Sequence, residues 1–238
     1  MTKDGEKHFK GQKISEVILG SQDGIVNVLG VVLGVASATN NSLIILVAGL
    51  AAAFAETISM GAVAYTSVKA ERDYHKAERK LEEWEVEETP EAEAREIRSI
   101  YAKKGFKGSL LNQIVKVITS NKKVWVDTMM AEELNLPPVF QKSPWRSGLL
   151  VLIATLLGSL GPILPFFWLS VSSAVVTSLF ISIMLLFVIG ALKAKLTVGN
   201  WFLSGAELAV IGIVAALVGY LMGFAVGEIF GTRALALG

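Results

Sequence analysis

Five stretches of this chain are apolar over a length that can cross a lipid bilayer, and they limit the fold to a helical membrane protein. Hydrophobic residues occupy 53% of the 238 positions. A spanning helix needs about 20 mostly apolar residues, because hydrocarbon offers no partner to backbone polar groups. The predicted spans are residues 14–38, 43–68, 147–169, 172–192 and 202–230.

A polar segment separates the second span from the third. We therefore expect three parts: residues 1–68 with a short N-terminal segment and two spans, a helical insert over 69–146, and residues 147–238 with three spans. Basic residues near the spans predict the orientation, since cytoplasmic loops are enriched in them. They are Lys3, Lys7, Lys10, Lys13, Lys193 and Lys195. The N-terminus and the insert are expected on the cytoplasmic side.

The insert is predicted to be helical throughout. Glu, Lys, Ala and Arg dominate residues 71–88, so the second span should continue as one long helix. The Thr-Pro-Glu sequence at 89–91 is typical of a new helix, with an N-cap, a proline in the first turn and an acid. Two further helices are expected over 107–119 and 122–134.

Asp23 and Glu56 are carboxylates that lie inside the first and the second span. A buried charge there costs at least ~2.5–3.5 kcal/mol, so such residues usually line a bundle interior or an ion path. Asp23 and Asn27 are four apart and share a helix face, and so do Glu56 and Met60. Together they offer carboxylates, an amide oxygen and a thioether, which suit a divalent transition metal. Alternatively, Asp23 lies at the membrane interface and Glu56 is a hydrogen-bonded glutamate of the protein core.

The insert concentrates acidic residues, with eleven between positions 71 and 96. A charge run is usually a solvated helix face. Here the spacing favours a metal site, because Glu82 and Glu85 are three apart on one helix. Glu93 and Glu96 repeat that spacing on the next helix. The turn at 89–90 would fold the two pairs toward each other, and a divalent cation would neutralise them.

Two adjacent methionines form a third candidate element. Met129 and Met130 are expected to be exposed on an acidic helix that continues to Glu133. Thioethers beside carboxylates suit Fe²⁺ or Mn²⁺ better than Ca²⁺ or Mg²⁺. The alternative is core packing, in which methionine fills gaps. His8 and His75 are too isolated for a histidine metal site and are expected at the surface.

Composition and missing motifs exclude several classes. The chain has no cysteine, which excludes disulfides, thiolate metal sites and a cysteine nucleophile. A net charge of +1 gives no field that would attract nucleic acid. No Walker-type loop, G-x-S-x-G or H-E-x-x-H sequence appears, and no E-x-x-H pair of a di-iron enzyme. We therefore expect that the chain is not an enzyme.

Several motifs together resemble the vacuolar iron transporter family, in order and over nearly the whole chain. They are Ser21-Gln22-Asp23-Gly24, Ile58-Ser59-Met60-Gly61 with Tyr65, the glutamate-rich helices, and Trp125-x-Asp127-x-Met129-Met130-x-x-Glu133. The resemblance implies a homodimer that moves Fe²⁺, and often Mn²⁺, out of the cytosol in exchange for protons. It implies an ion path between the membrane domains, with Asp23 and Met60 in it. The implied ligands of a cytoplasmic metal-binding domain are Glu82, Glu85, Glu93, Glu96, Met129, Met130 and Glu133.

The chain departs from this family at two acids. Plant members carry the carboxylate of the second span one turn earlier, where this chain has Ala52, and Glu56 is expected to substitute for it. The family's Gly-Glu-Tyr is here Val-Ala-Tyr at 63–65, so Ala64 replaces an acid near the inner mouth. Both changes could alter the ion preference.

We therefore expect a five-span helical transporter, dimeric, that exports Fe²⁺ or Mn²⁺ by proton antiport through Asp23, Asn27, Glu56 and Met60. No tightly bound cofactor is expected; Fe²⁺, or Mn²⁺, Co²⁺ or Zn²⁺, is substrate and insert ligand. Its partners are lipid, protons and a second copy. The membrane would be the cell membrane in a prokaryote and the vacuolar membrane in a eukaryote. The alternatives are a membrane-anchored metal sensor or store and, less favoured, a metal oxidase.

Overall fold

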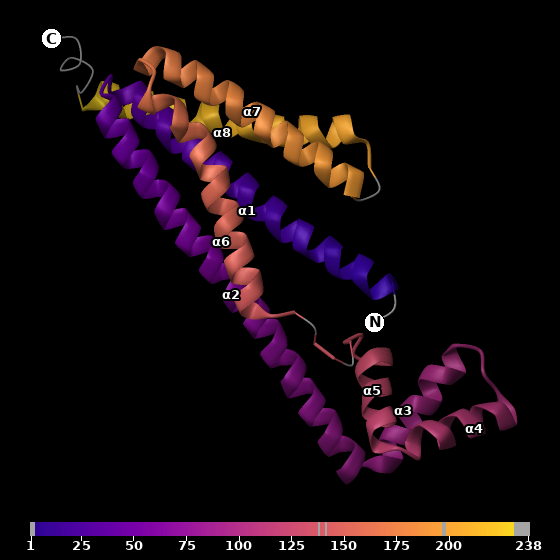
Figure 1. Ribbon diagram of the computed structural model, residues 1–238. Helices are drawn as coiled ribbons and strands as arrows, with labels where there is room; N and C mark the ends of the chain where they lie inside the picture. The colour runs from indigo at the N-terminus through magenta and orange to yellow at the C-terminus, as the bar shows by residue number, and fades with distance from the viewer. Residues whose placement is uncertain (1–2, 138, 141, 197–198, 231–238) are drawn as a thin grey trace. The chain divides into compact units, whose positions relative to one another are not determined.

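The computed structural model describes residues 3–137, 139–140, 142–196 and 199–230, and the regular elements among them are all helices (Figure 1). The elements are α1 (Lys3–Ala38), α2 (Ser42–Glu88), α3 (Pro90–Lys103), α4 (Gly108–Thr119), α5 (Lys122–Glu132), α6 (Pro144–Ile163), the 3₁₀ helix η1 (Leu164–Phe167), α7 (Val171–Leu196) and α8 (Trp201–Ile229). Five segments are long and apolar enough to cross a membrane: Ile14–Ala38, α2, Pro144–Phe167, α7 and α8. The predicted all-α class with five spans is confirmed.

The long helix α2 is continuous over 47 residues, as predicted (Figure 1). At 1.5 Å per residue it is about 70 Å long, more than twice the ~30 Å of bilayer hydrocarbon. Its polar C-terminal half therefore lies beyond the length that a membrane needs. Helix α3 begins with Pro90 in the first turn, and the Thr89 hydroxyl donates to the Glu85 carbonyl at 3.0 Å instead of capping α3.

Contacts divide the chain into two compact units. One comprises Met1–Tyr65 with Pro144–Gly238, and the other comprises Thr66–Ser143. In the first unit α1 packs against α6, α7 and α8, while α7 packs along α8. One fully buried apolar core of this unit includes Val28, Leu29 and Val32 of α1, Ile45 of α2 and Ile163 of α6.

Glycines let the helices of the first unit approach closely, as small residues do in membranes. A Cβ on Gly24 would lie 2.4 Å from the Thr155 carbonyl oxygen of α6, and one on Gly223 only 1.8 Å from the Gly34 carbonyl oxygen of α1. Ser37 of α1 adds a hydrogen bond from its hydroxyl to the Tyr220 carbonyl of α8 at 2.9 Å. Backbone contact therefore fixes α1 against two neighbours.

The second unit folds around a core of its own. Its buried side chains come from all four helical segments: Val86 of α2, Ile97 of α3, Leu111, Val115 and Ile118 of α4, and Trp125, Val126, Met129 and Met130 of α5. Gly105, in the turn after α3, and Gly108, the first residue of α4, adopt φ of +99° and +60°. Asn121 caps α5, since its side-chain oxygen accepts from the Val124 amide. Four helical segments thus share one apolar core.

Gly223→Ala should lower the stability of the first unit, because the new methyl group meets backbone that cannot rotate away. We expect a loss of about 1–3 kcal/mol from overpacking, although alanine favours a helix by roughly 1 kcal/mol. Gly30→Ala is the matched control, since its Cβ would meet only the Ala215 carbonyl oxygen at 3.7 Å. Thermal unfolding in detergent is the measurement. Equal melting temperatures for the two variants would contradict the packing.

Candidate metal centre

Three glutamates meet where α2 turns into α3. One carboxylate oxygen from each of Glu82, Glu85 and Glu93 lies within 4.8 Å of the other two. The turn is closed by backbone hydrogen bonds, since the Thr89 amide donates to the Glu85 carbonyl and the Ala92 amide donates to the Thr89 carbonyl. Glu82 and Glu93 are only 4% and 5% exposed. The helix reversal thus brings two predicted acid pairs together in a largely buried position.

Two more carboxylates complete the group at its exposed edge. Glu96 lies one turn after Glu93 on α3, and Glu133 follows the last residue of α5. The Glu133 carboxyl group lies within hydrogen-bonding reach of Glu96. Both residues are exposed. All five predicted carboxylates therefore gather from three helices.

The group is electrostatically strained while it is empty of cations. Burial first, and then repulsion from the neighbouring carboxylates, raise the pKa of Glu82 and of Glu93 to about 7. The same causes, with the hydrogen bond to Glu96, raise the pKa of Glu133. Within the described residues, one buried oxygen each of Glu82 and Glu93 has no hydrogen-bond partner. A divalent cation would pair with these oxygens and oppose the repulsion.

The two methionines are not exposed, so that expectation is wrong. Met129 and Met130 are both 0% exposed and belong to the apolar core of the second unit. Their burial fits the packing role, since Trp125, Val126, Met129 and Met130 are the buried residues of α5. The ligand role stays a prediction, because a buried thioether could still approach an ion at the edge of this core.

Ion pairs that the sequence did not reveal hold α5 in place. Arg79 of α2 lies 2.8 Å from the Asp127 carboxylate of α5, and its Nε lies 3.2 Å from Glu83. Lys122 pairs with Glu87 of α2. Asp127 is two residues before the methionines, so the pair with Arg79 fixes the helix that carries them. The partners are 48 positions apart, and no local pattern predicts such a pair.

His75 is buried, contrary to the prediction of a surface residue. It is 5% exposed, and its Nε2 contacts the carbonyl oxygen of Pro137. Its ring packs at 5.8 Å from the ring of Phe140. Lys142 pairs with Glu71 nearby at 2.9 Å. The segment after α5 is thereby attached to α2.

The first unit brings two membrane carboxylates together. The side chains of Asp23 on α1 and Glu56 on α2 are in hydrogen-bonding contact, and both residues are partly buried. Met60 is partly buried one turn after Glu56. Because carboxylates are rare inside apolar helices, their meeting from two helices is the principal polar feature of this unit.

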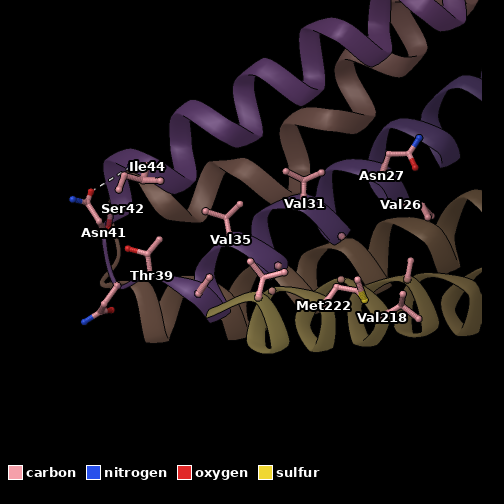
Figure 2. A pocket seen from close by; sticks show the side chains of 18 residues that line it. Val26, Asn27, Val31, Val35, Thr39, Asn41, Ser42, Ile44, Val218 and Met222 are labelled. Atoms are coloured by element: carbon pink, nitrogen blue, oxygen red, sulfur yellow. Dashed lines mark hydrogen bonds between the residues drawn. The ribbon is translucent and has the colours of Figure 1, made fainter. Parts of the chain in front are cut away.

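Asn27 faces a different space. It is exposed and lines an open cavity of about 1400 Å³ between α1, α8 and the turn before α2. Figure 2 shows Asn27 and Val31 of α1 with Met222 of α8 on its walls. Thr39 and Asn41 lie at the end near the turn (Figure 2). The cavity is polar at that end and otherwise mostly apolar.

Glu16 is a further carboxylate of α1 that the sequence analysis did not single out. Glu16 accepts a hydrogen bond from the Ser147 hydroxyl of α6 at 2.7 Å. It precedes Asp23 by seven residues, two helical turns, and so lies on nearly the same face. Gly148, next to Ser147, packs against Gly61 and Tyr65 of α2. Glu16 is therefore at the level of α2 where Ala64 stands; the seven-residue spacing could have revealed it.

Metal-free protein should become less stable as pH rises from 5 to 8. Glu82 and Glu93 have a pKa of about 7 in the fold against 4.5 in the unfolded chain, so the stabilisation by their protonation is complete below about 4.5 and lost above 7. Melting temperatures of the full chain in detergent with chelator should fall by several degrees, since ~1 kcal/mol moves the value by about 2–4 °C. Mn²⁺ should reverse the loss.

Glu82→Gln/Glu93→Gln should flatten this pH dependence. Glu91→Gln is the matched control, because Glu91 is an exposed acid in the first turn of the same helix. A control that flattens the curve as much as the double variant would disprove the assignment to the buried pair.

Met129→Leu/Met130→Leu should lower the preference for Fe²⁺ over Mg²⁺ and leave the fold intact. Leucine conserves the buried volume at a cost usually under ~1.5 kcal/mol, but it removes the sulfur that favours transition metals. Calorimetric competition on the full chain under anaerobic conditions is the measurement, with the melting temperature as control. An unchanged preference would assign both side chains to packing alone.

Known proteins resemble the chain over most of its length. The VIT family model matches residues 14–224. Vacuolar iron transporter 1 of Tulipa gesneriana is 33% identical over 226 residues, which cover 94% of this chain and 92% of that protein. Vacuolar iron transporter 1 of Arabidopsis thaliana is 33% identical over 219 residues, which cover 91% of this chain and 88% of that protein.

The similarity extends beyond plants. The vacuolar iron transporter of Toxoplasma gondii is 33% identical over 231 residues, which cover 93% of this chain and 76% of that protein. The matched region includes both the membrane carboxylates and the acidic helices. From the family match and these relatives, the chain belongs to the VIT family.

Proposed function

We propose that this chain transports Fe²⁺ or Mn²⁺ out of the cytosol in exchange for protons. The VIT family is a family of transporters and not of enzymes, and the relatives are named as iron transporters. The observation that carries the proposal is the contact of Asp23 with Glu56 between two apolar helices. A protein that only anchored a metal-binding domain would not need two carboxylates at that position.

Exchange follows from the proximity of these carboxylates. A divalent cation between them balances both charges, and its departure leaves two like charges in contact. Proton uptake by one of them removes the repulsion, so the cation and the proton compete for one site. Met60 supplies a thioether one turn from Glu56, which favours a transition metal over Ca²⁺.

Glu16 extends this path toward the N-terminal end of α1. It lies on nearly the same face as Asp23 and at the level of Ala64, where the family pattern has an acid. We assign it the role of the missing acid near the inner mouth. Its hydrogen bond to Ser147 orients one oxygen and leaves the other available to a passing cation.

The carboxylate group of the second unit captures the ion in this proposal. Glu82, Glu85 and Glu93 bind it, with Glu96 and Glu133 at the exposed edge. This unit and the N-terminus lie on the cytoplasmic side, and two copies form the transporter. The membrane is the cell membrane in a prokaryote and the vacuolar membrane in a eukaryote.

The same carboxylate group favours one rival, a membrane-anchored metal sensor or store. Such a protein would bind metal in the second unit and move none. Flux across a bilayer therefore separates the two functions, whereas metal binding alone does not.

Glu56→Gln should abolish transport and leave metal binding by the second unit intact. We expect flux into proteoliposomes with a pH gradient to fall at least ~10-fold, or 1.4 kcal/mol, because a ligand and proton acceptor is lost. Fe²⁺, Mn²⁺ and Ca²⁺ flux would be measured at equal protein, with calorimetry for binding. Glu207→Gln is the carboxylate control, because Glu207 is an exposed acid in the apolar helix α8. Wild-type protein that binds metal without flux would establish the sensor or store instead.

A further inference from the structure

The outward face of α2 in the second unit carries a row of exposed apolar side chains. Tyr74, Leu81 and Trp84 are 55%, 46% and 56% exposed. Ala70 and Ala77 are exposed on the same face. The spacings from 70 to 84 are four, three, four and three, the heptad repeat of a coiled coil. We call these five residues the α2 seam.

The seam lies away from the core of its own unit. Val68, His75, Glu82 and Val86 of α2 are buried there, at 8%, 5%, 4% and 7% exposure. At 100° per residue their mean direction is about 140° from that of the seam. Helix α2 thus has two distinct faces, one packed within the unit and one open.

We propose that the α2 seam pairs with the α2 seam of a second copy, as a parallel two-stranded coiled coil; this deepens the homodimer of the proposed function. All copies in one membrane share one topology, so their α2 helices run in the same direction. A repeat of this kind is self-complementary in register, because each layer meets the identical layer of its partner. The two alanine layers alternate with larger ones and allow close approach.

The size of the seam favours a membrane-held copy over a free protein. An aromatic side chain buries 150–250 Å², so three half-exposed large side chains supply on the order of 300 Å² per copy, against ~800 Å² in a stable interface. Two chains held in one bilayer meet at a raised effective concentration and need less area. Lipid does not explain the row, since Trp84 is sixteen residues, or about 24 Å along the helix, beyond Val68.

Charges beside the seam fit the parallel register in part. In a parallel pair, flanking residues five positions apart face each other across the seam. Lys80 would face Glu85 of the other copy, a favourable pair in the metal-free protein, since the proposed function assigns Glu85 to the ion. Asp73 would face the glutamate at position 78, an unfavourable one. Pairing should therefore be firmer near Leu81 and Trp84 than near Ala70.

Single cysteines test the seam directly, because the chain has none of its own. Ala77→Cys and Leu81→Cys in the full chain, reconstituted in liposomes, should form disulfide-linked dimers under mild oxidation. Lys69→Cys and Lys76→Cys should not; both are exposed positions about 100–120° around α2 from the seam, which we call the far-side positions. Disulfides need Cα atoms within about 7 Å, so the pattern reports the facing side. When the lipid-to-protein ratio is increased tenfold, disulfide linkage through a cysteine at position 81 should persist, whereas linkage by random collision should vanish.

The outcomes of these experiments test the α2 seam separately from the transport function. Equal linkage at seam and far-side positions, or linkage only on the far side, would overturn the proposal. The protein could prove to be a dimer by light scattering and to transport metal, yet form no disulfide through cysteines at positions 77 or 81. That result would overturn the seam and leave the proposed function standing. Leu81→Lys should lower the dimer fraction at least threefold in the full chain, whereas Leu110→Lys on α4, 52% exposed off the seam, should not. An unchanged dimer fraction for Leu81→Lys would also overturn it.

Discussion

Repulsion among buried carboxylates is the constraint on which the second unit depends. Glu82 and Glu93 are almost fully buried and have other acids within reach, so the fold must hold together groups that drive each other apart. The opposing interactions are the apolar core of α2 to α5 and the ion pairs around α5, with Arg79 and Asp127 among them. An unpaired buried polar group costs about 1–3 kcal/mol, a large share of a typical stability. Such strain is expected where a ligand completes the structure.

The first unit has a different requirement. Its carboxylates must be kept in position inside apolar surroundings. Backbone-to-backbone packing through Gly24 and Gly223 leaves α1 little freedom to rotate against α6 and α8. Asp23 and Glu16 are carried on that same helix. The rigidity of α1 therefore sets which direction its acidic face presents to Glu56.

Sequence reasoning recovered the features that depend on local pattern. The five spans follow from hydropathy, the continuous α2 from helix formers, and the start of α3 from the Thr-Pro-Glu turn. The gathering of Glu82, Glu85 and Glu93 was also expected, because three-residue spacing on two helices joined by a tight turn fixes the faces. These are short-range consequences of helical geometry.

What the sequence did not reveal depends on contacts between distant segments. The burial of His75 depends on a loop sixty residues later, and the burial of Met129 and Met130 on three other helices. The pairing of Arg79 with Asp127 and of Glu16 with Ser147 is equally long-range. Asn27 shares a face with Asp23 by spacing, yet it lines a cavity that α8 completes.

The near-neutral titration of two glutamates has a consequence for how metal loading would be observed. With a pKa of about 7, Glu82 and Glu93 are partly protonated at pH 7, so an ion that pairs with both carboxylates displaces the proton that each partly holds. The heat of binding then includes the ionisation heat of the buffer that receives this proton. Titrations in phosphate and in Tris would differ by the number of released protons multiplied by the difference between the ionisation enthalpies of the two buffers, so the comparison counts the protons that leave the site.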